Sequence, residues 1–165
     1  MKRMSPGRRI LTSVAASTAV AGFLADWNRT HLFNPNWPPH ARFHDALSIL
    51  LGCLLGVSGL YFLCRWTWHP DSDLALGTLL PAFFWAAQGA SFAFPGAEGF
   101  ESEFPEKVPR VKEVWVNERF SSVLMLALLA VGYAAERRRL AWRRVQKLFG
   151  ATLAGMDGDL VSDEH

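Results

Sequence analysis

The sequence predicts an all-α integral membrane protein, a four-helix bundle with a basic amphipathic extension toward the C-terminus. The prediction rests on how charge is distributed. Half of the 165 residues are hydrophobic, whereas the 17 Lys and Arg and 15 Asp and Glu gather at the two ends and in three connecting stretches. Four long segments between them are almost free of charge. A soluble domain is disfavoured, because charges should recur along its exposed surfaces.

The four uncharged segments are residues 10–25, 46–64, 74–94 and 120–135. About 20 helical residues cross a hydrocarbon core of about 30 Å, and open strands would leave backbone groups unpaired in lipid. With flanking residues added, we predict membrane spans at about 10–27, 45–66, 74–95 and 117–137. Residues 1–150 are then one transmembrane domain that includes a basic extension at 138–150, and residues 151–165 form an acidic, disordered tail.

Small residues recur every four positions in the first two spans, at Thr18, Gly22 and Asp26 and at Ser48, Gly52 and Gly56. Small side chains let helix backbones approach closely in lipid, so we expect both faces to point into the bundle. Pro38 and Pro39 suit the start of the second helix. Continued by fours, the second series reaches His44 and His40, which we therefore expect to face the neighbouring helices.

In the third span, Gln88 is the one deeply placed amide. Its side chain is expected either to make an interhelical hydrogen bond or to contact a ligand.

The distribution of Lys and Arg predicts the orientation. Eleven lie in the N-terminal segment, the second connection and the stretch after the fourth span, against six in the first and third connections. By the positive-inside rule, the protein is a multi-pass protein of the inner (cytoplasmic) membrane with both termini in the cytoplasm. Residues 1–21 also fit a cleavable secretory signal, which would leave the later spans in the same direction.

The sequence lacks CxxC, Walker, GxSxG, GxGxxG and HExxH motifs. The basic residues are too few and too localised to predict a nucleic-acid-binding surface, so we expect no nucleic-acid partner. Whether the protein is an enzyme stays open.

The stretch from Asp26 to Asp45 concentrates the polar residues that could carry chemistry, including three of the five His. Three interpretations are open: a structural hydrogen-bond network, a pocket for an organic ligand, or a site for one divalent metal ion. The candidate catalytic residues are His40, His44 and Asp26, with Asp26 orienting an imidazole that moves a proton. The candidate ligand-binding residues are Asn28, His31, Asn34, Trp37, Gln88 and Glu118. The candidate metal ligands are His31, His40 and His44.

The series Asp26-Trp27-Asn28-x-Thr30-His31 and Asn34-Pro35-x-Trp37-Pro38-Pro39-His40-Ala41-x-Phe43-His44 resembles the signature of an uncharacterised family of small bacterial and fungal multi-span membrane proteins. The resemblance implies a four-helix membrane fold and no established activity. In architecture alone, the four-span plan also resembles the sterol-isomerase and sigma-2-receptor-like proteins, whose acidic catalytic residues have no counterparts in these spans.

Our leading hypothesis is an outward-facing pocket of His, Asp and Asn side chains that binds or transforms a small lipophilic molecule. The alternatives are an accessory or assembly subunit of a membrane complex and a metal-binding membrane protein. The expected partners are membrane lipid, a lipophilic ligand, and either another membrane protein or further copies of the chain.

Overall fold

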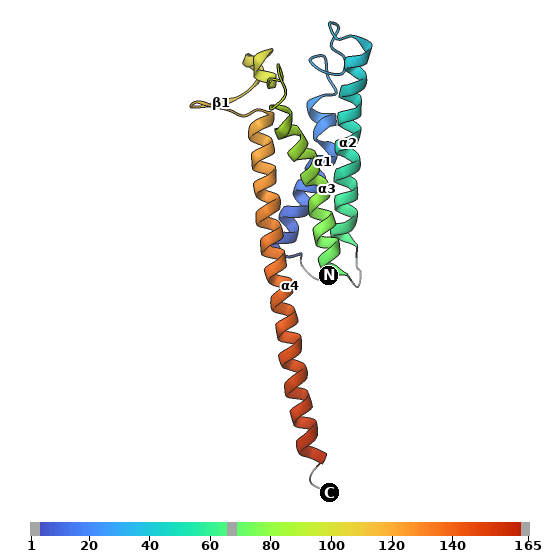
Figure 1. The fold of residues 1–165 in the computed structure, drawn as a ribbon, viewed down its shortest axis with the longest axis vertical. Helices are drawn as coiled ribbons and strands as arrows, with labels where there is room; N and C mark the ends of the chain where they lie inside the picture. Colours follow the sequence, from blue (N-terminus) through green and yellow to red (C-terminus); the bar gives the residue numbers. More distant parts are fainter. Residues whose placement is uncertain (1–3, 66–68, 163–165) are drawn as a thin grey trace.

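The computed structural model describes residues 4–65 and 69–162 and, within this part of the chain, contains four α-helices. They are α1 (Pro6–Ala25), α2 (Pro39–Cys64), α3 (Pro70–Ser91) and α4 (Glu118–Ser162) (Figure 1). The all-helical prediction is confirmed. Each predicted span lies largely within one of these helices.

Helix starts are set by proline. Pro6, Pro39 and Pro70 occupy the first turns of α1, α2 and α3, where a missing backbone N–H breaks no helical hydrogen bond. The side chain of Ser5 also caps α1 by accepting from the backbone N–H of Arg8. The helices therefore begin before the uncharged segments do.

The α3–α4 connection, residues 92–117, contains four short elements of secondary structure. It contains two short 3-10 turns, η1 (Phe100–Ser102) and η2 (Pro105–Lys107), and a two-stranded antiparallel hairpin. In the hairpin, β1 (Arg110–Val111) pairs with β2 (Val114–Trp115), and Arg110 lies opposite Trp115. This connection lies at the same end of the bundle as the α1–α2 loop, residues 26–38 (Figure 1).

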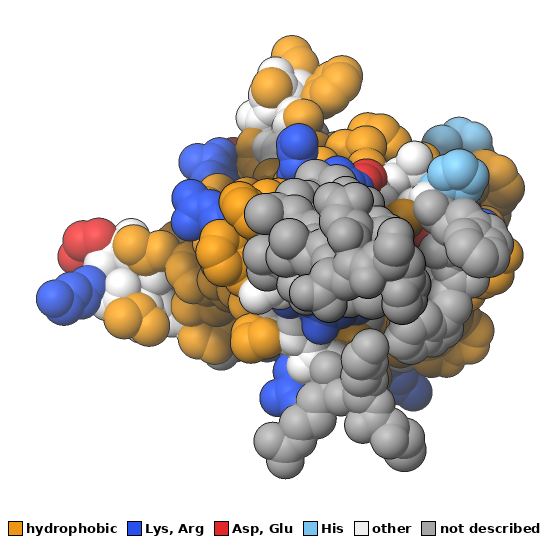
Figure 2. Space-filling model, turned by 90° about the horizontal axis from the view of Figure 1, so that it is seen from below, with side chains coloured by type: hydrophobic (Ala, Val, Ile, Leu, Met, Phe, Trp, Pro, Cys, Tyr) orange, Lys and Arg blue, Asp and Glu red, His pale blue; other side chains and the backbone are white. Residues whose placement is uncertain are grey.

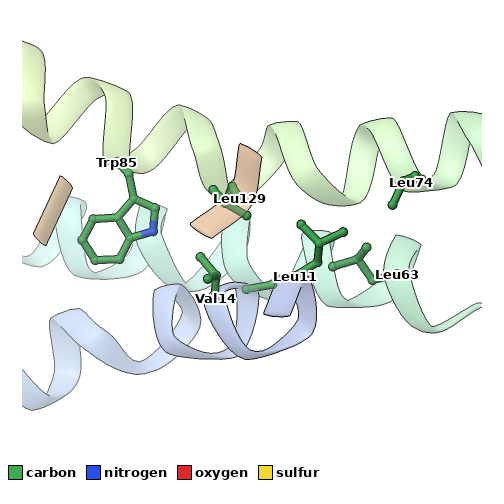
Figure 3. Close-up of a cluster of buried hydrophobic side chains, with 7 residues drawn as sticks. Leu11, Val14, Leu63, Leu74, Trp85 and Leu129 are labelled. Carbon is green, nitrogen blue, oxygen red and sulfur yellow. The ribbon is translucent and has the colours of Figure 1, made fainter. Parts of the chain in front are cut away.

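In the bundle, α1 packs against α2 and α4, and α3 packs against the same two helices. The buried cluster between them includes Leu11, Val14, Leu63, Leu74, Trp85 and Leu129 (Figure 3). The indole Nε1 of Trp85 donates to the buried Thr18 hydroxyl at 2.8 Å, which joins α3 to α1. Buried polar groups are thus paired across the helix interface.

The predicted inward series is only partly correct. Thr18, Gly52 and Gly56 are buried, but Ser48 is exposed. A helix turns about 100° per residue, so a strict four-residue repeat drifts about 40° at each step. The buried residues of α2 follow alternating steps of three and four instead, at Ile49, Gly52, Gly56, Gly59 and Leu63.

The sides of the bundle are strongly apolar. Large hydrophobic residues are exposed on all four helices, among them Leu24, Leu54, Phe83 and Val123. Hydrophobic side chains also cover much of the molecule's rim when it is seen from its lower end (Figure 2). By length and composition, two helical segments could cross a membrane, Pro39–Cys64 and Glu118–Lys147. Helices α1 and α3 do not meet the same criteria of length and composition.

Helix α4 extends well beyond the other helices (Figure 1). Where it leaves the bundle, the buried carboxylate of Glu136 accepts hydrogen bonds from Arg139 and from the Ser5 hydroxyl. Further along, Arg144 forms an ion pair with Asp71 at the start of α3. The helix continues to Ser162, through most of the segment that the sequence analysis expects to be disordered. No proline interrupts that segment.

Candidate functional site

The α1–α2 loop meets the α3–α4 connection around His31. The centroid of the His31 ring lies 4.8 Å from that of Phe100 and 5.9 Å from that of Trp37. A cavity of about 540 Å³ lies beside these rings. We call it the His31 cavity; its lining includes Thr30, His31, Trp37, Glu98, Phe100, Glu103 and Glu118. His31, Trp37 and Glu118, three predicted ligand-binding residues, are therefore brought together.

Neighbouring side chains orient the His31 imidazole. The Thr30 hydroxyl donates to Asn28 Oδ1 at 2.6 Å and lies 3.0 Å from His31 Nδ1. A hydroxyl has one proton to donate, so the Thr30 oxygen is left to accept from Nδ1–H of His31. This assignment leaves Nε2 as the ring nitrogen on the side of Asp26.

Asp26 lies beside that nitrogen. Its Oδ1 is 3.8 Å from His31 Nε2, and both side chains are largely buried. Asp26 follows the last residue of α1 and so lies outside the helices. Burial raises the pKa of Asp26 to about 6, His31 lowers it, and the negative charges of Asp45 and Glu118 raise it. The Asp26 carboxyl group beside His31 therefore binds a proton more readily than an exposed aspartate does.

Asp45 is a site residue that the sequence analysis missed. Its Oδ2 atom is buried and accepts no hydrogen bond from the described residues. Asp45 also precedes Ile49 by four residues, so it extends the inward series of α2 by one step. This spacing is the feature of the sequence that could have identified Asp45 as an inward-facing residue. The charge of Asp45 acts on Asp26, as do those of His31 and Glu118.

Glu118 and Gln88 join the site to the bundle. Glu118 Oε2 accepts from the backbone N–H of Phe100 at 3.2 Å, which fixes the α3–α4 connection over the start of α4. Gln88 Nε2 donates to the backbone carbonyl of Glu118 and to the Ser122 hydroxyl, each at 3.1 Å. Gln88 thus forms the interhelical hydrogen bonds that were one of its two predicted roles, and it is not part of the cavity lining.

The two predicted asparagines stabilise the α1–α2 loop. Asn28 accepts from the backbone N–H and hydroxyl of Thr30, and Asn34 is buried and bonds to Thr30 and Asn36. Arg42 also donates to the backbone carbonyl of Asn34 at 2.8 Å. The structural hydrogen-bond network considered for this stretch is therefore present, and Thr30 connects it to His31.

His40 and His44 lie apart from this network. Both side chains are exposed, so the expectation that they face the neighbouring helices is wrong. The drift of a four-residue repeat explains it, because the two positions lie three and four steps from the buried Gly56. Their Nε2 atoms are 3.1 Å apart. Asp26, which was expected to orient one of these imidazoles, lies beside His31 instead. Within the described residues, no three His, Cys, Asp or Glu side chains are grouped to hold a metal ion.

The α3–α4 connection supplies further carboxylates. Glu98 and Glu103 line the His31 cavity, and both residues are exposed. An adjoining cavity of about 550 Å³ shares Glu98 and Gly99 and adds Trp115 and Phe120. We take the His31 cavity as the site because it is lined by His31, whose Nε2 lies 3.8 Å from Asp26 Oδ1. No sequence signal marks Phe100 or Glu103, since their proximity to His31 depends on how the loops pack.

Comparison with known proteins gives a family and no activity. A family model described as "Family of unknown function (DUF6640)" matches residues 10–147, more than half of the chain. No curated protein and no solved structure matches the chain. The family match agrees with the resemblance to an uncharacterised family in the sequence.

Proposed function

The chain belongs to this family of unknown function, and we propose that it is an integral membrane protein that binds a small lipophilic molecule, preferably a cationic one, in the His31 cavity. The observation that carries the proposal is the composition of that cavity, whose lining combines aromatic rings, carboxylates and one imidazole.

Membrane insertion is supported by the apolar sides of the bundle. Exposed residues such as Leu50, Leu54 and Val123 would each face water in a soluble monomer, and contiguous apolar surface of this kind favours lipid. We propose that all four helices span the inner membrane and that α4 continues into the cytoplasm. The excess of Lys and Arg at that end supports this orientation. The His31 cavity then opens on the outer side.

The ligand class follows from the lining of the cavity. A volume of about 540 Å³ is within the range of small-molecule sites. Trp37 and Phe100 offer apolar and cation–π contacts, and Glu98, Glu103 and Glu118 provide negative charge. An amphipathic molecule with an apolar body and a protonated amine matches both features. Its body would enter between the aromatic rings and its cation would lie near the glutamates.

The same site has a group that can move a proton. We assign this role to His31, through Nε2, with Asp26 as its partner and Thr30 as the residue that orients the ring. His40 and His44 are exposed and Asp26 lies beside His31, so we do not give them that role. Ligand binding requires no proton transfer. A reaction catalysed by His31 and Asp26 would therefore be a further property of this site.

The test is a comparison of two probes on purified, detergent-solubilised protein. We expect saturable binding of a fluorescent long-chain amine and about tenfold weaker binding of the corresponding alcohol, which corresponds to about 1.4 kcal/mol. His31→Ala and Glu118→Gln should each weaken amine binding. His40→Ala/His44→Ala is the matched control and should bind as the wild type does. Equal binding of amine by wild type and His31→Ala would contradict the proposal.

A second candidate function is supported by the length of α4. Its extension carries several Arg with exposed Trp142 and Phe149, and it projects past the bundle (Figure 1). Such a helix suits an anionic lipid surface or a partner protein in an assembly. Purification in mild detergent separates the candidates, since a stoichiometric partner protein favours an accessory subunit and a solitary chain favours the ligand-binding protein.

A further inference from the structure

The first turns of α2 bring two imidazoles together outside the His31 cavity. His40 and His44 are four residues apart, so they share one face of the helix. Their Nε2 atoms are 3.1 Å apart, and their ring centroids are 4.5 Å apart with the ring planes at 79°. The two Nε2 atoms therefore lie close enough to bind one ion or to share one hydrogen bond.

That separation suits metal chelation. Bonds of about 2.0–2.1 Å from two imidazole nitrogens to one ion, at an angle of about 90–109°, place the nitrogens about 2.8–3.4 Å apart. The observed 3.1 Å lies inside this interval. A single hydrogen bond between the rings has a similar length, but in exposed side chains water competes for it and little net stability results.

Local packing restrains the two rings. Phe43 stacks on His40, with ring centroids 6.1 Å apart, and meets His44 edge-on at 5.5 Å. Pro38 and Pro39 fix the start of the helix immediately before His40. These ring contacts favour the chelating arrangement before an ion arrives, and such preorganisation reduces the entropy lost on binding.

We propose that His40 and His44 form a two-histidine site for a borderline divalent transition ion, with Cu²⁺ bound more tightly than Zn²⁺. Imidazole donors suit these ions, and the order follows the general affinity series. Within the described residues, no third His, Cys, Asp or Glu joins them. Water or another small ligand completes the coordination, so the site is open on its solvent side. The inference is independent of ligand binding at His31.

Calorimetric titration of the full chain, prepared in detergent without chelator, tests the proposal with Cu²⁺ and Zn²⁺ salts as the probes. We expect one ion per chain. Loss of the second ligand should weaken binding by about a hundredfold, because the tethered imidazole acts at high effective concentration. His40→Ala and His44→Ala should each show this loss, and acid should release the ion because the ligating imidazoles must be neutral.

Two variants make the test specific. His44→Ala/Ala41→His keeps the number of histidines but places them on adjacent positions that do not face each other, so it should bind as weakly as His44→Ala. His31→Ala should retain the full metal affinity while it loses amine binding. Electron paramagnetic resonance of the Cu²⁺ form should show two coordinated imidazole nitrogens. Unchanged affinity in His40→Ala, an equal loss in His31→Ala, or no binding by the wild type would each overturn the proposal.

Discussion

Helices α1 and α2 approach closely at Gly56, and enlarging this residue tests the packing of the bundle. A Cβ atom at Gly56 would lie 2.4 Å from the backbone nitrogen of Ala19 and 2.7 Å from the carbonyl oxygen of Ala15. Ordinary contact begins near 3.4 Å, so α1 would have to retreat by about 1 Å. Because the obstructing atoms belong to the backbone, a change of rotamer cannot relieve the contact.

The matched control is Gly89→Ala on α3. There a Cβ would meet Ser122 Cβ at 3.4 Å, an ordinary contact. Both substitutions gain the same intrinsic helix propensity, about 1 kcal/mol. The difference between the two variants therefore isolates the cost of overpacking, which we expect to be about 1–3 kcal/mol.

The assay is reversible unfolding in detergent, with tryptophan fluorescence followed as a denaturing detergent is added. Gly56→Ala should unfold earlier than the wild type, and Gly89→Ala should unfold at the same point or later. If Gly56→Ala is as stable as Gly89→Ala, the close approach of α1 and α2 is refuted.

Two further predictions concern charged groups. Burial raises the pKa of Asp26 from 3.8 to about 6, so protonation of its carboxyl group favours the folded state. This contribution to the free energy of unfolding is complete below pH 3.8 and is lost as the pH rises through about 6. Thermal unfolding of the wild type should therefore show stability falling over that interval, and Asp26→Asn should flatten the profile; an unchanged profile would count against the buried carboxylate. Glu136→Gln should destabilise the protein by about 1–3 kcal/mol, because it leaves the Arg139 cation without its carboxylate. The exposed Arg138 provides the comparison, since Arg138→Gln should change unfolding little, and equal effects would contradict the assigned network.

The helices could be predicted from sequence because their signal is local. Each uncharged segment is long enough for a helix, and prolines such as Pro39 and Pro70 mark where two of them start. The faces of the helices were harder to predict. Gly52 and Gly56 were correctly placed inside, but extending the same repeat to His44 and His40 accumulated an angular error that turned both outward.

The site was only partly predictable for a different reason. His31 and Asp26 are close in sequence, so their pairing within one loop is local. The contact between His31 and Phe100 joins residues far apart in the chain and depends on the packing of two irregular connections. Asp45 belongs to a helix whose inward face had been assigned to other positions. Which of the predicted residues lie together at the site therefore depends on the conformation of the two loops and on the rotation of α2 about its axis.

Photolabelling of the membrane-reconstituted chain with a long-chain amine that carries a diazirine tests the central claim most directly. The account predicts labelled peptides from residues 26–37 and 96–104, with labelling abolished by excess unmodified amine and reduced in His31→Ala. Labelling confined to the apolar outer face of α2, around Leu50 and Leu54, and unaffected by competitor would contradict binding in the His31 cavity.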